Sequence, residues 1–557
     1  MTSPEGNELT AAIEQLKLEG NELYKKNQYE KASLKYTEAI EKDPTNHILL
    51  ANRAAAYLAT NQYVDAAWDC QQAIALDPSY AKAWSRLAAA AHALELWEHC
   101  IEAWQKALEC LPSDESAMTP ADKAVKVQFE EGLKKAKSAS RSKGSSSRMG
   151  VEKTARKLPW TVAKSLIETG QLDNSSSAWV IGSAYQEYKQ GLDMINSSRF
   201  ENGMFYGKPD ALMNLCNGIL CDERVFHLDN RDFPAKLTSQ CRFENVACKG
   251  WAEEGGPDLV KKEAVERLAK DGWNATRPAI AVTLRTWIFT AYFRSELAGH
   301  RHAAHELYLN ALNVLQWGRE QWPDVPKNER GAVFERSFIR GVKRLKMLNM
   351  HKTLVGGVPA NPPYTEEDLA EVARDLIQDV DSDPVPTWAE DIPGHFSASW
   401  PYTKASALSI LGWYHMFKAS ESEEENERID HNRQAADHYQ EAADLYSLDD
   451  ENHPYFLCTA LDCLNKVNAP LNEIVPLCKD IRDAIPQALA IWQVSSAAAA
   501  LPLIKKEITE FEFKVIMGLV KGELTMDSVV KMDPIAPAKM SEGGKSAGNS
   551  KDTKEAK

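Results

Sequence analysis

The chain lacks a long apolar run and an excess of basic charge. Its longest apolar stretch, residues 495–504, is about half a membrane span. The formal net charge of -15 argues against nucleic acid as a partner. Residues 1–9 are polar and show no basic-then-apolar signal pattern. We therefore expect a cytoplasmic protein with no membrane partner.

Cysteine is also scarce, and common catalytic motifs are missing. The 10 cysteines are spread along 557 residues, which predicts reduced thiols. One grouping, Cys216, Cys221, Cys241 and Cys248, has pairs spaced more widely than most structural zinc sites allow. No GxSxG elbow, GxxxxGK[ST] loop or HExxH helix is present. The sequence therefore predicts no catalytic residue, no metal and no cofactor.

A repeat occupies the first part of the chain. Small residues at two offsets, and a proline at a third, recur at a constant period: Ala32, Ala66 and Cys100; Ala39, Ala73 and Ala107; Pro44, Pro78 and Pro112. A period of about 34 residues with these features is typical of the tetratricopeptide repeat, a pair of antiparallel helices. We predict an all-α fold with a polar tail over 1–10, three repeats over 11–114 and a capping helix over 115–137.

Five polar side chains fall in the first helix of the repeats: Lys17, Asn21, Asn52, Lys82 and Arg86. Residues four apart share a helix face, and first helices line the concave groove of a stacked repeat array. Three cations and two amides facing one groove predict a site for an anionic ligand.

The remainder of the chain is less regular. Residues 138–157 form a serine-rich basic segment, predicted to be a linker or a localisation signal, and residues 532–557 are predicted to be disordered. Between them, 158–531 is predicted to be a larger helical domain with degenerate repeat-like hairpins, because two segments repeat the small-aromatic-small pattern: Ala304, Tyr308 and Ala311; Ala435, Tyr439 and Ala442. Any packed amphipathic helix favours the same pattern. The stretch 201–234 reads as irregular because Gly, Asn and Asp cluster there.

The segments "LKLEGNELYKKNQYEKASLKYTEAIEKDP", "LANRAAAYLATNQYVDAAWDCQQAIALDP" and "YAKAWSRLAAAAHAL" resemble the carboxylate-clamp repeat domains of heat-shock co-chaperones. The small glutamine-rich and the stress-inducible organising co-chaperones are the most similar, over residues 11–137 only. The family's clamp of Lys, Asn, Asn, Lys and Arg matches Lys17, Asn21, Asn52, Lys82 and Arg86. The resemblance implies binding of the C-terminal Glu-Glu-Val-Asp peptide of heat-shock protein 70 or heat-shock protein 90.

These observations favour a co-chaperone or adaptor over two alternatives. One alternative is an enzyme of unknown class within 158–531, targeted to chaperones by the repeats. The other is a scaffold with two helical grooves, in which 158–531 binds a second protein partner.

Overall fold

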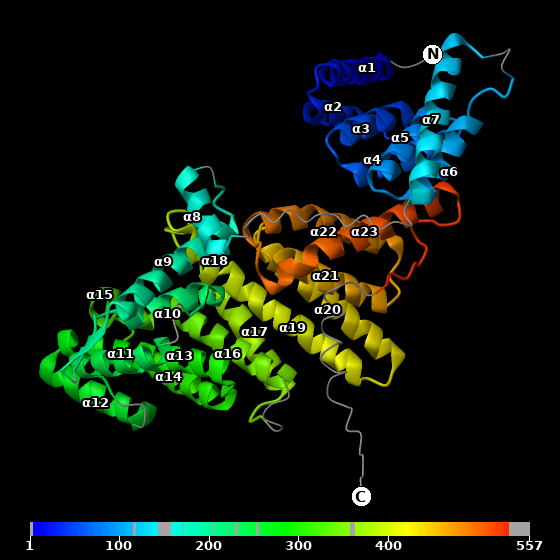
Figure 1. Cartoon of the computed structure of the whole chain (residues 1–557). Coiled ribbons are helices and arrows are strands. Elements are labelled where there is room, and N and C mark those ends of the chain that lie inside the picture. Colours follow the sequence, from blue (N-terminus) through cyan, green and yellow to red (C-terminus); the bar gives the residue numbers. More distant parts are fainter. Residues whose placement is uncertain are drawn as a thin grey trace, which may run out of the picture. The chain divides into compact units, whose positions relative to one another are not determined.

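The computed structural model describes residues 4–114, 118–142, 157–170, 172–202, 204–228, 232–251, 255–356 and 362–533 (Figure 1). The fold is all-α, as predicted, with one two-stranded sheet in the described part. Among the described helices, none is both long enough and apolar enough to cross a bilayer. The chain divides into two compact units: unit 1 comprises residues 1–154, 470–478 and 503–532, and unit 2 comprises 155–469, 479–502 and 533–557.

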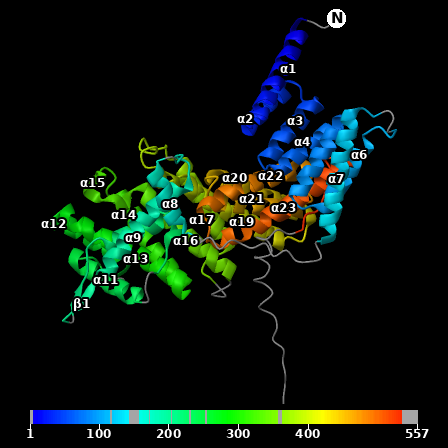
Figure 2. The same cartoon turned by 45° about the horizontal axis from the view of Figure 1, so that its top comes forward.

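Unit 1 begins with three helical hairpins (Figure 2). Their helices, followed by the helix after them, are α1 (Pro4–Lys25), α2 (Tyr29–Lys42), α3 (His47–Ala59), α4 (Tyr63–Leu76), α5 (Ala81–Ala93), α6 (Trp97–Glu109) and α7 (Pro120–Ser142). The turn within each hairpin contains one residue with a positive φ: Asn27 (58°), Asn61 (62°) and Glu95 (58°). Asparagine tolerates this left-handed conformation best among residues with a side chain. The same turn therefore recurs at the repeat period.

Small residues let the paired helices approach closely. Ala32 and Ala39 of α2 are 0% exposed, and Tyr36 between them is 2% exposed. A Cβ atom on Gly20 of α1 would lie 2.6 Å from the Tyr36 ring, which is inside contact distance. The Tyr36 ring therefore fits against α1 only because position 20 is glycine.

Two helices, not one, pack against the third repeat. The predicted capping helix is α7, whose Phe129 ring lies 5.4 Å from that of Trp104 in α6. The second is α23 (Ser496–Val520), whose Phe513, Ile516 and Met517 are buried in the same core as α4 to α6. Residues 503–532 therefore belong to unit 1, although we predicted one domain over 158–531. The apolar residues of α23 do not recur at the repeat period, so the sequence did not predict that this helix packs against the repeats.

Unit 2 is a larger array of helices. Its elements are α8 (Pro159–Thr169), α9 (Ser177–Asn196), β1 (Arg199–Glu201), β2 (Met204–Tyr206), α10 (Ala211–Cys221), η1 (Glu223–Val225), α11 (Phe233–Cys248), α12 (Gly256–Asp271), α13 (Trp273–Ala298), α14 (Arg301–Gln321), α15 (Lys327–Arg330), η3 (Ala332–Phe334), α16 (Arg336–Gly356), α17 (Glu366–Asp381), α18 (Pro393–Ser399), α19 (Pro401–Glu421), α20 (Glu425–Leu445) and α21 (Asn452–Lys466). Helix α22 (Leu471–Ile491) begins in unit 1 and ends in unit 2.

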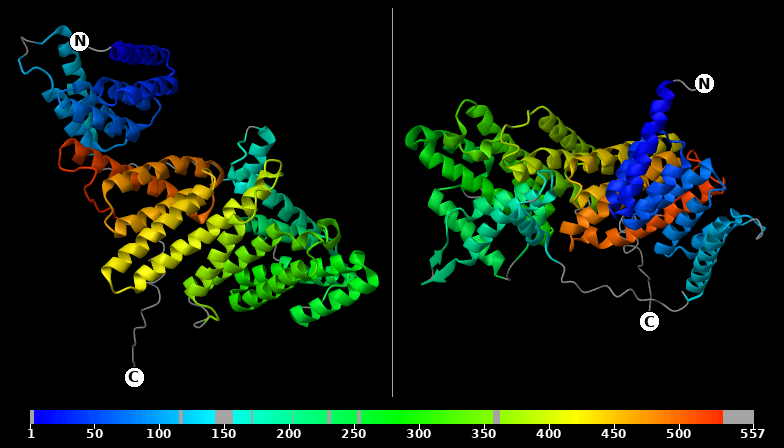
Figure 3. Two further views of the ribbon diagram at one scale, coloured as in Figure 1. Left: turned by 180° about the vertical axis from the view of Figure 1, so that it is seen from behind. Right: turned by 90° about the horizontal axis from the view of Figure 1, so that it is seen from above.

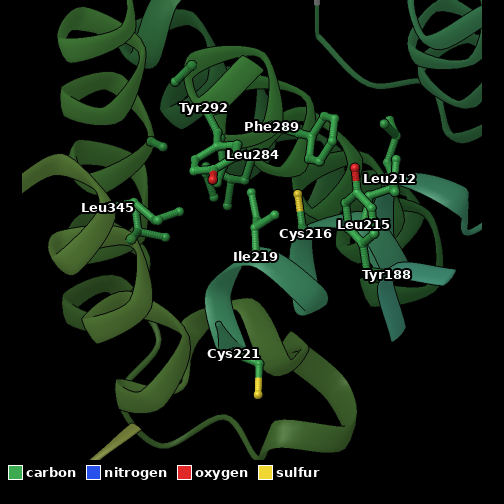
Figure 4. Close-up of a cluster of buried hydrophobic side chains, with 14 of the residues drawn as sticks. Tyr188, Leu212, Leu215, Cys216, Ile219, Cys221, Leu284, Phe289, Tyr292 and Leu345 are labelled. Atoms are coloured by element: carbon green, nitrogen blue, oxygen red, sulfur yellow. The ribbon is translucent and has the colours of Figure 1, made fainter. Parts of the chain in front are cut away.

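The interpretation of 201–234 as irregular was wrong. This stretch contains β2, which pairs with β1 in an antiparallel hairpin, and the buried helix α10. Figure 4 shows α10 side chains such as Leu215 and Ile219 among Phe289 and Tyr292 of α13. Glycine in α10 serves packing, because a Cβ on Gly218 would lie 2.7 Å from Tyr188 of α9. Asn214, Asn217 and Gly218, which made the stretch look irregular, lie inside this helix.

Helices α19 and α20 reproduce the repeat packing. A Cβ on Gly412 would lie 2.8 Å from the ring of Tyr439, as Gly20 does against Tyr36. The two helices lie side by side as an antiparallel pair (Figure 3). Helices α19 and α20 are each 21 residues long, whereas α2 to α6 have 13 or 14. The acidic stretch 421–427, where the two helices meet, therefore falls in the length that exceeds a normal repeat.

The predicted tail and linker segments differ from the structure or lie outside the described residues. Helix α1 begins at Pro4, inside the predicted polar tail 1–10. Helix α7 continues to Ser142, inside the predicted linker 138–157. Residues 143–156, and residues 534–557 of the predicted disordered tail, lie outside the described part of the chain.

Candidate functional site

The five predicted clamp residues lie on the first helices of the three hairpins. Lys17 and Asn21 are on α1, Asn52 is on α3, and Lys82 and Arg86 are on α5. Helix α3 packs against both α1 and α5. The fold therefore places these residues on neighbouring helices, although they span about seventy positions of sequence.

Two of the five residues are in direct contact. The Asn52 side chain donates from Nδ2 to Oδ1 of Asn21 at 3.4 Å. The Tyr36 hydroxyl of α2 donates to the same Asn21 oxygen at 2.8 Å. With Oδ1 occupied by two donors, the Asn21 amide keeps its N–H groups for a ligand. An amide that offers donors and not its oxygen suits an anion.

Tyr36 is the site residue that sequence reasoning did not assign. The repeat pattern identified it as a packing residue, and the structure gives its hydroxyl a second role in orienting Asn21. Burial raises the pKa of Tyr36 to about 12, partly opposed by the charge of Arg86. The hydroxyl therefore stays protonated at neutral pH and remains a donor.

Arg86 has unused hydrogen-bonding capacity. Its Nη1 is buried and has no hydrogen-bond partner within the described residues. Leaving a buried charged donor unsatisfied costs about 1–3 kcal/mol or more, so such a group favours an incoming acceptor. A carboxylate would satisfy it.

The two lysines are more exposed. Lys17 is paired with Glu14 of the same helix at 2.5 Å, with 25% of its side chain exposed. Lys82 is exposed. A surface pair one turn apart contributes little stability, so Lys17 can exchange Glu14 for a ligand carboxylate at small cost.

A buried ion pair holds α3, which bears Asn52. Arg53 donates from Nε and Nη2 to the two carboxylate oxygens of Asp69 in α4, at 2.8 and 2.7 Å. Its Nη1 donates to Thr37 of α2 at 3.0 Å. This bidentate geometry fixes the orientation of α3 relative to both second helices.

Helix α23 contacts second helices of the repeats. Glu512 accepts from Trp68 Nε1 of α4 at 3.4 Å, and Lys521, directly after the end of α23, pairs with Glu102 of α6 at 2.8 Å. The Phe513 ring lies 5.6 Å from that of His99 in α6. These contacts are made to α4 and α6, whereas the five predicted clamp residues lie on α1, α3 and α5. Helix α23 therefore supports the repeats through their second helices.

Two of the four grouped cysteines of unit 2, Cys216 and Cys221, donate to different backbone carbonyls. The Cys216 thiol donates to the Arg285 carbonyl at 3.3 Å, and the Cys221 thiol donates to the Val180 carbonyl at 3.7 Å. Burial raises the pKa of both thiols. In the described residues, no group of His, Cys, Asp and Glu has the geometry of a metal site.

Comparison with known proteins places the similarity in the repeats. A family model described as TPR repeat matches residues 20–61. The small glutamine-rich tetratricopeptide repeat-containing protein 2 of Saccharomyces cerevisiae is 41% identical over 128 residues, covering 23% of this chain and 35% of that protein. The heat-shock protein cognate co-chaperone sgt12 of Aspergillus fumigatus is 41% identical over 106 residues, covering 19% of this chain and 31% of that protein.

A solved structure of the first repeat domain of Spaghetti, bound to a peptide of heat-shock protein 90, is also similar. It is 31% identical, covers 24% of this chain and 94% of that chain, and has a TM-score of 0.21. The curated relatives are matched over only about a third of their own length.

Proposed function

Because its N-terminal quarter belongs to the tetratricopeptide-repeat family and is similar to heat-shock co-chaperones, we propose that this chain is a cytoplasmic co-chaperone or adaptor. Its repeats bind the C-terminal Glu-Glu-Val-Asp peptide of heat-shock protein 70 or heat-shock protein 90. The observation that carries the proposal is the donor set on α1, α3 and α5, in which Asn21 and Asn52 are in contact and Arg86 has an unsatisfied buried N–H.

The chemistry of the peptide fits this donor set. A C-terminal aspartate presents two carboxylates close together, its side chain and the chain end. Lys17, Lys82 and Arg86 provide charge-assisted donors. Asn21 and Asn52 provide neutral donors without adding further positive charge. An internal aspartate lacks the second carboxylate, so the site selects a chain terminus.

The test is a titration of the full chain with a free Glu-Glu-Val-Asp peptide and with the same peptide amidated at its C-terminus. Removing a charged hydrogen bond costs about 1.5–3 kcal/mol, so Arg86→Ala and Lys82→Ala should each weaken binding roughly tenfold to a hundredfold. Affinity should also fall with added salt.

Lys106→Ala is the matched control, because Lys106 is an exposed lysine of the second helix α6, paired with Glu109 at 2.8 Å. It should leave peptide affinity unchanged. Equal affinity for the free and amidated peptides, or equal losses in Lys106→Ala and Lys82→Ala, would overturn the proposal.

The proposal concerns the repeats alone. The similar co-chaperones match the N-terminal part of this chain, so they do not test whether 158–531 is an enzyme or binds a second protein. Both alternatives stay predictions for that part.

A further inference from the structure

Unit 2 contains a cavity of about 720 Å³ beside α13. Its wall includes three basic side chains, Arg277, Arg285 and Lys327, and two acidic ones, Asp210 and Glu244. Apolar side chains of α10, α13 and η3 supply much of the remaining lining. This size, and this mixture of apolar wall with a few polar groups, are typical of small-molecule sites.

Arg285 is the unusual member of this wall. The residue is 9% exposed, and its Nε has no hydrogen-bond partner within the described residues. Its Nη1 donates only to the Ala281 carbonyl of its own helix, at a long 3.4 Å. Burial lowers the pKa of the Arg285 guanidinium, and the nearby Glu244 and Asp210 oppose this only in part, because neither forms an ion pair with it.

The other buried arginines of unit 2 in the described part of the chain are Arg340, Arg344 and Arg482, and each is paired with an acid. Arg482 pairs with the neighbouring Asp483 at 3.3 Å. Arg340 pairs with Asp379 at 2.9 Å and with Asp383 at 2.8 Å. Arg344 pairs with Glu223 at 3.2 Å. Burying an arginine is tolerated where an anion compensates its charge. Arg285 lines a cavity and forms no ion pair with a described carboxylate.

The acidic residues of the wall do not fill this role. Glu244 accepts the Leu212 backbone N–H at 3.0 Å and the Gln240 side-chain amide at 2.7 Å through the same oxygen. It thereby holds the start of α10 to α11. Asp210 is exposed to water at the cavity mouth. Neither forms an ion pair with Arg285.

The other two basic residues lie toward the opening. Lys327 is exposed and Arg277 is partly exposed. Arg277 donates to the carbonyl of Asn328, and its side chain packs within 3.2 Å of the position that a Cβ on Gly331 would occupy. Gly331 has a φ of 99°, a conformation that favours glycine. Arg277 therefore holds the segment that forms one side of the cavity.

We propose that this cavity binds a small ligand through a carboxylate or phosphate group, with Arg285 as the principal contact and Arg277 and Lys327 adding positive charge. Arginine donates in a planar fork that matches both oxyanions. The site is separate from the clamp residues, and the proposal does not depend on the function proposed for the repeats.

Cys248 gives a local readout, because it lines the cavity and is partly exposed. The experiment measures its alkylation rate by peptide mass spectrometry in the full chain, with inorganic phosphate or glutarate as the probe. Cys110 of unit 1, also partly exposed, is the internal control. A probe at ten times its Kd leaves about a tenth of the sites free, so it should slow Cys248 alkylation about tenfold. The Cys110 rate should not change.

Arg285→Gln should abolish the protection, whereas Arg242→Gln, an exposed arginine of α11, should retain it. Protection by phosphate alone, by glutarate alone or by both supports the site and identifies the oxyanion. If Arg285→Gln fails to fold, Lys327→Gln at the exposed rim should still weaken the protection. The proposal is overturned if neither probe protects Cys248, or if sodium chloride at matched ionic strength protects it equally. It is also overturned if folded Arg285→Gln, or Lys327→Gln where Arg285→Gln does not fold, is protected as strongly as the natural chain.

Discussion

Replacing Phe513 by alanine tests whether a helix from the far end of the sequence is part of the repeat unit. Phe513 is 0% exposed and belongs to the core that contains α4, α5 and α6. Its ring lies 5.6 Å from the ring of His99, and Ile516 and Met517 are buried beside it in the same core. We expect Phe513→Ala to destabilise unit 1.

The magnitude follows from the lost packing. Truncating a fully buried phenylalanine costs about 3–5 kcal/mol, because the apolar contacts are lost and a cavity remains. For a unit of roughly 150–250 residues, each kcal/mol lowers the melting temperature by about 2–4 °C, so the expected decrease is roughly 6–20 °C. Because the total free energy of unfolding of a native protein is about 5–15 kcal/mol, this loss is a large fraction of it.

Hydrogen exchange of individual peptides locates the destabilisation, and thermal melting measures its size. Amides of α5 and α6 should exchange faster in Phe513→Ala, while those of α13 in unit 2 should not change. Leu503→Ala is the matched control, since Leu503 lies on the same helix, is 51% exposed and should alter stability by less than about 0.5 kcal/mol. Unchanged exchange in α5 and α6, or a loss of the same size in Leu503→Ala, would refute the placement of α23 in the repeat core.

Three further outcomes are expected. Tyr36→Phe removes the hydroxyl that donates to Asn21, so urea denaturation should show a loss of about 1 kcal/mol, and peptide titration should show weaker binding. Gly412→Ala places a methyl 2.8 Å from the Tyr439 ring. Overpacking costs about 1–3 kcal/mol, whereas the better helix propensity of alanine returns at most about 1 kcal/mol. Urea denaturation should therefore show a lower free energy of unfolding. Burial and two neighbouring histidines lower the pKa of His415 from 6.5 to about 4. The unfolded chain therefore binds the proton more readily, stability should fall as pH drops from about 6.5 toward 4, and melting of His415→Asn should show a weaker dependence over that range.

The repeats were predictable because their information is local and periodic. Alanine at two offsets and proline at a third mark helix contacts and helix ends directly in the sequence. The assignment of Lys17 and Arg86 to first helices follows from that register and agrees with α1 and α5. Helix α10 was missed because it is short, is buried on most sides and contains Asn214, Asn217 and Gly218, so its apolar residues gave no clear helical periodicity.

The sequence alone determined the type of repeat, and it predicted five clamp residues and an anionic ligand. Only the tertiary structure showed that the Tyr36 hydroxyl occupies the Asn21 oxygen, that α23 completes the core of the repeats, and that Arg285 lines a cavity without an acid partner. The physical reason is the range of the interactions. Helix periodicity and capping act within a few residues, whereas hydrogen bonds, core contacts and charge compensation depend on groups that the folded chain brings together from distant positions.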